Sequence, residues 1–166
     1  MDRLFAPWRL AYVTGASGSR SDDCIFCNTT EPGSADLILV RGRVSYVILN
    51  LYPYNNGHLM IVPDRHVATL AATSADEQSE LMRFTRHAEI ALTEAYAPQG
   101  FNVGINLGRP AGAGVLDHLH VHLVPRWNGD TNFMTVIGNV RVLPEALGDT
   151  VKRLKPIFER LAASDY

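Results

Sequence analysis

Three histidines alternate with apolar residues in the run His118-Leu119-His120-Val121-His122. Alternate side chains of a β-strand point to the same face, so the three imidazoles would line one surface at intervals of about 6.6 Å. The apolar residues between them would face the other side. A half-buried strand with incidental histidines, or a strand that only binds a metal, would carry the same pattern.

The central histidine is the best placed of the three to act as a nucleophile. A neutral imidazole has an ordinary pKa near 6.5 and can attack an electrophilic phosphorus without a strong base to activate it. The two flanking histidines can fix its tautomer or contact the leaving group. Backbone N–H groups of the glycine-rich loop at 108–114 could hold phosphate oxygens. The spacing therefore predicts that His120 attacks phosphorus and becomes a covalent intermediate.

The sequence has two cysteines, Cys24 and Cys27, in the spacing Cys-x-x-Cys. One tight turn can present both thiolates to a metal ion, and two nitrogen ligands from elsewhere would complete the tetrahedral site that structural zinc prefers. A redox pair is an alternative, although no βαβ pattern surrounds the motif, and two unliganded thiols are another. The pair therefore needs partners elsewhere in the chain.

Short strands and two longer helices must position these residues. Ser74 and Glu77 have the spacing of a capping box, which begins a helix that runs to Ala95 with apolar residues three to four apart. A second apolar stripe at 147–161 indicates another helix, which Pro156 should kink or split. Strands are expected at 36–40, 43–50, 58–62, 101–107 and 119–124. This order predicts an α+β domain with an antiparallel sheet of about five strands.

Length and composition fit one domain. The 166 residues are 46% apolar, which can supply one buried core, and the formal charge of -2 favours neither nucleic acid nor a membrane surface as partner. The N-terminal segment has no sustained apolar stretch, so we expect a cytoplasmic protein. We expect one domain over 1–166, with an arm and loop at 1–23, a catalytic core at 24–127 and a C-terminal extension and helix at 128–166.

The histidine run resembles the His-φ-His-φ-His-φ-φ signature, in which φ is apolar, of the histidine-triad (HIT) superfamily of nucleotide hydrolases and transferases. Residues 47–66 resemble the nucleoside-binding strand pair of those proteins, and Asn106 resembles the polar residue that enters their phosphate loop. The resemblance implies a two-step reaction, in which a nucleotidyl-histidine forms and a second acceptor resolves it. His120 would be the nucleophile, and His122 would contact the phosphate or the leaving group.

A narrower resemblance, to bacterial diadenosine tetraphosphate phosphorylases of the HIT type, rests on APWRLAY at 6–12, LNLYPYNNGHLM at 49–60 and HLHVHLVPRWNGDTNF at 118–133. It implies that phosphate accepts the nucleotidyl group and that the products are ADP and ATP. Hydrolysis of dinucleoside polyphosphates or of nucleoside phosphoramidates is the alternative. A zinc-stabilised nucleotide-binding module without catalysis, and a metal-storage or sensing surface, are alternatives of other classes.

The resemblance also implies the metal ligands and the pocket. In zinc-bearing relatives, and in galactose-phosphate uridylyltransferases, the ligands occupy the positions of Cys24, Cys27, His66 and His118 in this chain. Zinc there would be structural, and a further divalent cation could accompany the substrate. The expected contacts to the nucleotide and its phosphates are Asn50, Leu51, His58, Asn106, Gly112, Gly114, His122 and Trp127.

Several of these positions have other interpretations. Asn50 replaces an aspartate that contacts the ribose in many relatives, but it could be a turn residue. Ala113 and Gly114 leave only backbone donors where many relatives have a hydroxyl or amide side chain. Trp127 could stack on a base or seal a subunit contact. His87, on the first predicted helix, is expected to be solvated.

Superfamily members pair their sheets across a two-fold axis into one larger sheet. The resemblance therefore implies a homodimer or a dimer of dimers, with the segment at 132–143 as a candidate for further assembly.

Overall fold

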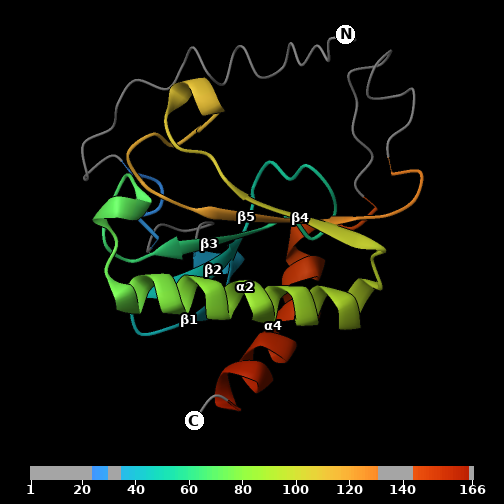
Figure 1. Ribbon diagram of the computed structural model, residues 1–166. Coiled ribbons are helices and arrows are strands. Elements are labelled where there is room, and N and C mark those ends of the chain that lie inside the picture. Colours follow the sequence, from blue (N-terminus) through green and yellow to red (C-terminus); the bar gives the residue numbers. More distant parts are fainter. Residues whose placement is uncertain (1–23, 30–34, 131–143, 165–166) are drawn as a thin grey trace, which may run out of the picture.

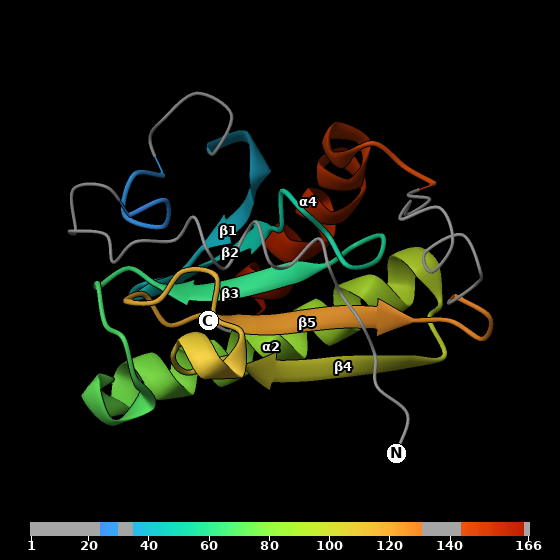
Figure 2. The same cartoon turned by 90° about the horizontal axis from the view of Figure 1, so that it is seen from above.

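The computed structural model describes residues 24–29, 35–130 and 144–164. Within these ranges two longer helices, α2 (Ala75–Tyr96) and α4 (Leu147–Ala163), lie against one face of an antiparallel sheet (Figures 1 and 2). The strands in spatial order are β1 (Ile38–Arg41), β2 (Ser45–Leu49), β3 (Leu59–Pro63), β5 (Val121–Arg126) and β4 (Gly100–Ile105). The predicted α+β fold with five strands and two main helices is confirmed. The arm at 1–23 and the segment at 132–143 lie outside the described residues.

In the described part of the chain, three short 3-10 turns accompany these elements. They are η2 (Ala35–Leu37), η3 (Leu70–Ala72) and η4 (Arg109–Ala111). The first of them occupies the start of the strand expected at 36–40. Among the described helices, none combines the length and apolar character that crossing a bilayer requires.

The central strands are buried on both faces. In β2, Val47 and Leu49 pack toward the helices, whereas Tyr46 and Ile48 pack on the opposite face with the segment at 24–29. Because each face has its own apolar cover, β2 and β3 are buried along their whole length. The cysteine-bearing segment is therefore part of the second apolar cluster of the domain.

The histidine run enters the sheet later than the sequence indicates. β5 begins at Val121, so His122 lies in the strand, while His118 and His120 lie in the segment that precedes it. The prediction that this strand begins at residue 119 is therefore wrong, because the strand begins at Val121.

The reason for this late start is the end of the neighbouring strand. β3 ends at Pro63, which has no N–H group with which to extend the ladder. The N–H of Leu119 instead donates to the carbonyl of Val67, at 2.6 Å. The predicted alternation persists, since Leu119 and Leu123 both pack in the core beneath the sheet.

Two expectations about the helices need correction. Pro156 does not split the second helix, since α4 runs through it as one helix, and the neighbouring Leu154 and Phe158 are fully buried beneath the sheet. Their burial offsets the backbone hydrogen bond that a proline removes. His87 is 1% exposed and packs 6.0 Å from the ring of Phe84, because α2 contacts both the sheet and α4 and so buries more than one stripe.

The start of α2 is tied to the end of β3. Ser74 and Glu77 form the predicted capping box, in which the Ser74 oxygen accepts from the Glu77 N–H and the Glu77 carboxylate accepts from the Ser74 N–H. The same carboxylate accepts two hydrogen bonds from Arg65, at 3.0 and 2.7 Å. Glu77 thereby holds the residue that precedes His66.

The hydrogen bonds from Arg65, together with those from Ser74, lower the pKa of Glu77 to about 2. A lowered folded-state pKa adds stability above the unfolded value, and that stability is lost as the pH falls toward the folded value. We expect Glu77→Gln to lower the free energy of unfolding by about 2 kcal/mol near neutral pH, with a difference from wild type that shrinks between pH 4.5 and 2. Urea denaturation across this range measures it. A difference that is constant with pH would contradict the assignment.

Candidate active site and metal centre

Four potential metal ligands converge at one side of the sheet. The ligand atoms of Cys24, Cys27, His66 and His118 all lie within 4.8 Å of one another. The Sγ of Cys24 lies 3.3 Å from Nδ1 of His118, and the Sγ of Cys27 lies 3.3 Å from Nδ1 of His66. In a tetrahedral zinc site with ordinary bond lengths, sulfur and nitrogen ligands lie about 3.6 Å apart. The cluster therefore fits a four-coordinate metal ion with two sulfur and two nitrogen ligands.

Hydrogen bonds within the chain orient these groups. The N–H groups of Cys27 and Asn28 both donate to the carbonyl of Cys24, at 3.0 Å, and this turn places the two thiols side by side. Nε2 of His118 lies 2.8 Å from the carbonyl of Pro63. Because a carbonyl only accepts, the ring proton is on Nε2, and the lone pair of Nδ1 faces the cysteines.

The electrostatics of the cluster favour a cation. Burial, the hydrogen bond to Cys24 and its charge raise the pKa of the Cys27 thiol to about 11. Two adjacent thiolates are therefore unfavourable at neutral pH unless a positive ion binds them. Burial lowers the pKa of His118, so its ring is neutral, as a ligand must be.

His120 is held as a neutral imidazole with a defined tautomer. Its Nδ1 lies 2.9 Å from the backbone carbonyl of His118, which only accepts, so the proton is on Nδ1 and the lone pair is on Nε2. Burial lowers the pKa of His120, and the bond to His118 opposes this only in part. The ring of Phe26 packs 5.0 Å from the His120 ring. These contacts produce an imidazole whose nucleophilic nitrogen is unprotonated.

A second imidazole pair lies next to His120. The N–H of Tyr54 donates to Nδ1 of His58, at 3.1 Å, so His58 carries its proton on Nε2. That Nε2 donates to Nδ1 of His122, at 3.0 Å. The proton of His122 is therefore on Nε2, and its ring lies 4.7 Å from the His120 ring, nearly perpendicular to it at 79°. A nucleophilic nitrogen and a hydrogen-bond donor thus occupy neighbouring rings.

The structure places the expected nucleoside contacts at the loop after β2. The side-chain oxygen of Asn50 accepts from the Tyr52 N–H, at 2.9 Å, which turns its amide nitrogen toward Nδ1 of His58, at 3.4 Å. Leu51 is 56% exposed and is not part of the core. His58 is fully buried, and its Nε2 contacts His122.

Several N–H groups of the glycine-rich loop at 108–114 form hydrogen bonds within the loop itself. The N–H groups of Ala111, Gly112 and Ala113 donate to carbonyls within the loop, at 3.2, 2.9 and 3.3 Å. Gly112 has a φ of 88°, which favours glycine. Gly114 follows this turn, and Asn106 is half-buried just after β4. The loop therefore has a fixed shape, in which the Gly112 N–H already has an acceptor.

Trp127 does not join the histidines. It follows the far end of β5, roughly 24 Å along an extended chain from His120. Its indole N–H donates to the carbonyl of Tyr96 at the end of α2, at 3.3 Å. This contact fixes the end of β5 against a helix.

Three groups that shape the site were not predicted from the sequence. Phe26 lies between the two cysteines and contacts the rings of His118 and His120. The Tyr54 N–H and the Pro63 carbonyl select two histidine tautomers through backbone groups, which every residue carries. Only the aromatic residue in the middle of the Cys-x-x-Cys motif was visible as a signal in the sequence.

Comparison with known proteins identifies the class. The family model of the HIT domain matches residues 33–129. A protein named AP-4-A phosphorylase, from Mycobacterium tuberculosis strain H37Rv, is 44% identical over 167 residues, which cover 96% of this chain and 86% of that protein. The chain belongs to the HIT family, the class of nucleotide hydrolases and transferases that the histidine run predicts, and it is an enzyme of that family.

Solved structures share the fold. A Zn-bound histidine triad family protein from Mycobacterium smegmatis matches with a TM-score of 0.70 and 24% identity, over 87% of this chain and 99% of that one. A uridylyltransferase mutant matches with a TM-score of 0.67 and 16% identity, over 92% of this chain and 51% of that one. These likenesses extend the sheet-and-helix architecture to proteins of distant sequence.

We expect the purified protein to bind one divalent metal ion per chain. Cys27→Ser or His66→Ala should remove the ion and lower Tm by about 5–10 °C, because the ion ties the segment at 24–29 to the sheet. Elemental analysis and thermal unfolding measure the two effects. His120→Ala is the matched control and should retain the ion. Full metal content in the first two variants would contradict the ligand set.

Proposed function

We propose that this protein is a nucleotidyltransferase that cleaves dinucleoside polyphosphates through a nucleotidyl-His120 intermediate. The observation that carries the proposal is the pair of fixed tautomers, with a lone pair on Nε2 of His120 and a proton on Nε2 of the neighbouring His122. The 44% identity to the M. tuberculosis AP-4-A phosphorylase supports diadenosine tetraphosphate as substrate and phosphate as acceptor.

In the first step, Nε2 of His120 attacks the α-phosphorus at one end of diadenosine tetraphosphate. The bond from that phosphorus to its bridging oxygen breaks, and ATP leaves with the electron pair, while the N–H of His122 stabilises the leaving oxygen. His120 then carries AMP on Nε2 and a proton on Nδ1. The positive charge of this ring strengthens the hydrogen bond to the His118 carbonyl.

In the second step, an oxygen of inorganic phosphate attacks the same phosphorus. The phosphorus–nitrogen bond breaks, ADP forms, and the lone pair returns to Nε2 of His120. The proposed contacts to the nucleoside are Asn50 and Leu51, and those to the phosphates are Asn106 and the loop around Gly114. Water in place of phosphate would give AMP instead of ADP.

The proposed metal is zinc, held by Cys24, Cys27, His66 and His118. Two sulfur and two nitrogen donors in tetrahedral spacing support that choice. When bound, zinc would compensate the charge of both thiolates and hold the four ligands together. Because the ring of His118 is in this cluster and its carbonyl holds His120, the site acts on the reaction by position.

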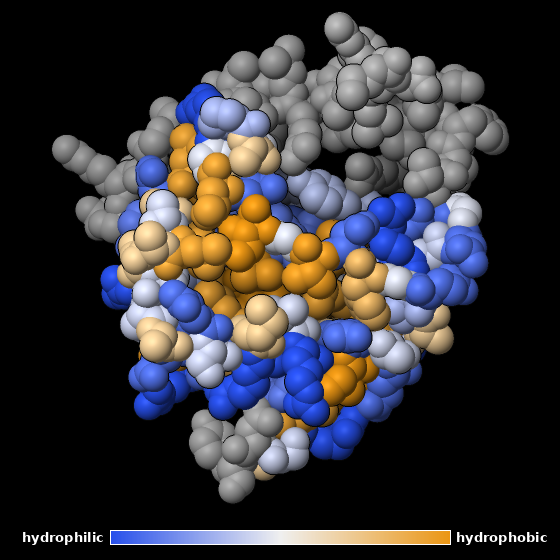
Figure 3. All heavy atoms as spheres, viewed as in Figure 1, coloured by the Kyte–Doolittle hydropathy of each residue, from blue (hydrophilic) through white to orange (hydrophobic). Residues whose placement is uncertain are grey.

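The proposed oligomer is a homodimer in which β4 continues the sheet. β4 is the last strand on its side of the sheet, so its outer edge has no partner strand among the described residues. Beside it, a groove of about 500 Å³ between α2 and β4 is lined mostly by apolar side chains. Two of the lining residues are exposed, Met82 to 69% and Val103 to 53%. Figure 3 shows an apolar patch on this side of the molecule. A second copy would cover both the strand edge and this face.

Product analysis tests the function directly. With diadenosine tetraphosphate and inorganic phosphate, we expect equal amounts of ADP and ATP, and we expect His120→Asn to lower kcat at least about 1,000-fold while nucleotide binding is retained. Chromatography of the products and calorimetric titration with AMP measure both. AMP and ATP in the presence of phosphate would indicate a hydrolase. Tight binding without turnover by the wild type would indicate a binding module.

The proposed dimer interface is tested by the oligomeric mass of variants at Val103. Val103→Lys should place a charge in the contact and convert the dimer to a monomer, whereas Val103→Thr should leave it dimeric. Light scattering coupled to size exclusion gives the mass of each variant. A wild-type monomer at micromolar concentration, or a dimer that survives the lysine, would contradict the proposed interface.

A further inference from the structure

A charged cluster lies at the C-terminal end of β5, and none of its residues has a role in the proposed reaction. The carboxylate of Asp130 accepts two hydrogen bonds from the guanidinium of Arg126, at 2.7 and 2.8 Å, and one from the Trp127 N–H, at 3.2 Å. The side chain of Asp130 is only 11% exposed. The bonds from Arg126 hold the pKa of Asp130 far below its usual range, so it is an anion at every working pH.

The cluster has a partner on the loop between β2 and β3. Nδ2 of Asn55 donates to Asp130, at 2.8 Å, and to the carbonyl of Pro125, at 3.1 Å. An amide nitrogen has two hydrogens, so this side chain is saturated as a donor. A bond to an anion is also stronger than one between neutral groups. Asn55 therefore anchors its loop to the end of β5.

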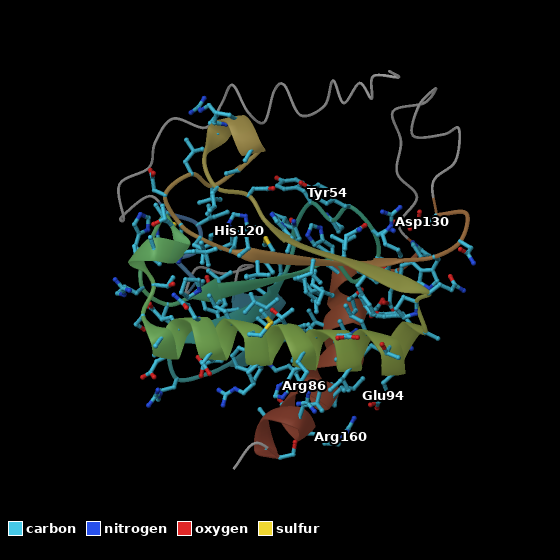
Figure 4. The ribbon with its side chains drawn as sticks, viewed as in Figure 1. Tyr54, Arg86, Glu94, His120, Asp130 and Arg160 are labelled. Carbon is cyan, nitrogen blue, oxygen red and sulfur yellow. The ribbon has the colours of Figure 1, made fainter. Side chains whose placement is uncertain are left out.

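The anchored loop is the one that orients the imidazole pair. The carbonyl of Asn55 accepts from the His58 N–H, at 3.2 Å, and the residue before it, Tyr54, donates its own N–H to Nδ1 of His58. The Tyr54 ring lies 4.7 Å from the His58 ring and 6.1 Å from the His122 ring. In Figure 4, Tyr54 and Asp130 lie on the same side of the sheet as His120.

The anchor matters because the shortest contact to Nδ1 of His58 is the Tyr54 N–H, at 3.1 Å, whereas the amide nitrogen of Asn50 lies 3.4 Å from the same atom. If the Tyr54 N–H turned away, the proton of His58 could move to Nδ1, and Nε2 of His58 would become an acceptor. His122 would then donate from Nδ1 and would present a lone pair, not a proton, from Nε2. The lone pair on Nε2 of His122 would then face the negatively charged leaving oxygen and could not stabilise it.

We propose that Asn55 and Asp130 are positioning residues, which clamp the loop at 50–58 so that the Tyr54 N–H keeps the proton of His122 on Nε2. The inference rests on the proposed function only for its consequence, the stabilisation of the leaving group by His122. The clamp itself is a statement about hydrogen bonds and tautomers. It also gives the Trp-Asn-Gly-Asp stretch at 127–130 a role, although Trp127 is distant from the histidines.

The direct test is the tautomer state of the histidines, read from ¹⁵N chemical shifts of the full-length metal-loaded protein. In the wild type, we expect His58 and His122 both to be protonated on Nε2 alone. In Asn55→Asp, which removes the donor and sets a second carboxylate beside Asp130, and in Asp130→Ala, we expect a mixture of tautomers at both rings. Unchanged wild-type tautomers in both variants would overturn the proposal.

The kinetic test uses AMP esters of phenol and p-nitrophenol as probes, alongside diadenosine tetraphosphate. Loss of a donor to the leaving oxygen should lower kcat about tenfold or more for the basic phenol leaving group and much less for p-nitrophenol, with KM nearly unchanged. Asp130→Asn, which keeps an acceptor oxygen, should recover part of the loss. Equal losses for both esters, or a change confined to KM, would overturn the positioning role.

Two controls separate this proposal from its alternatives. Arg43→Gln breaks an exposed ion pair with Asp76, away from the loop, and should change neither tautomers nor rates. Thermal unfolding of each variant identifies a loss that comes from misfolding. If the wild type transfers no nucleotide at all, the proposed function fails, while the ¹⁵N spectra still decide whether the clamp exists.

Discussion

One residue, His118, connects the two halves of the site. Its Nδ1 belongs to the cluster with the cysteines, its Nε2–H donates to the end of β3, and its backbone carbonyl holds the Nδ1–H of His120. These three contacts are coupled, because the ring and the backbone of a single residue move together. The position of the His120 ring therefore depends on the geometry of the cysteine–histidine cluster and on the strand that ends at Pro63.

The chemistry of the site comes from neutral rings with fixed protons. Burial disfavours the charged form of His118 and of His120, so both rings stay neutral. A neutral imidazole can donate from only one nitrogen, and a backbone carbonyl or N–H at the other nitrogen decides which one. His120 thus presents a lone pair and His122 presents a proton, although the two residues have the same side chain.

Much of the site was visible in the sequence because it depends on residue type and short spacing. The alternation of histidine with apolar residues gives the side-chain faces of the run, and the Cys-x-x-Cys motif gives two ligands from one turn. The capping box of Ser74 and Glu77 begins α2 where expected, because the bonds that form it are local. The burial of His87 was not visible, since it depends on how α4 packs against the second side of α2.

By itself, the sequence determined the fold class, the family and the candidate residues, since these follow from periodicity, spacing and side-chain chemistry. Only the tertiary structure decided which nitrogen of each histidine carries the proton. It also decided that β5 begins at Val121, that Trp127 lies away from the histidines, and that Asn55 meets Asp130 across 75 positions of the chain. The physical reason is that these outcomes depend on backbone carbonyls and N–H groups, which are the same in nearly every residue and acquire direction only in the folded chain.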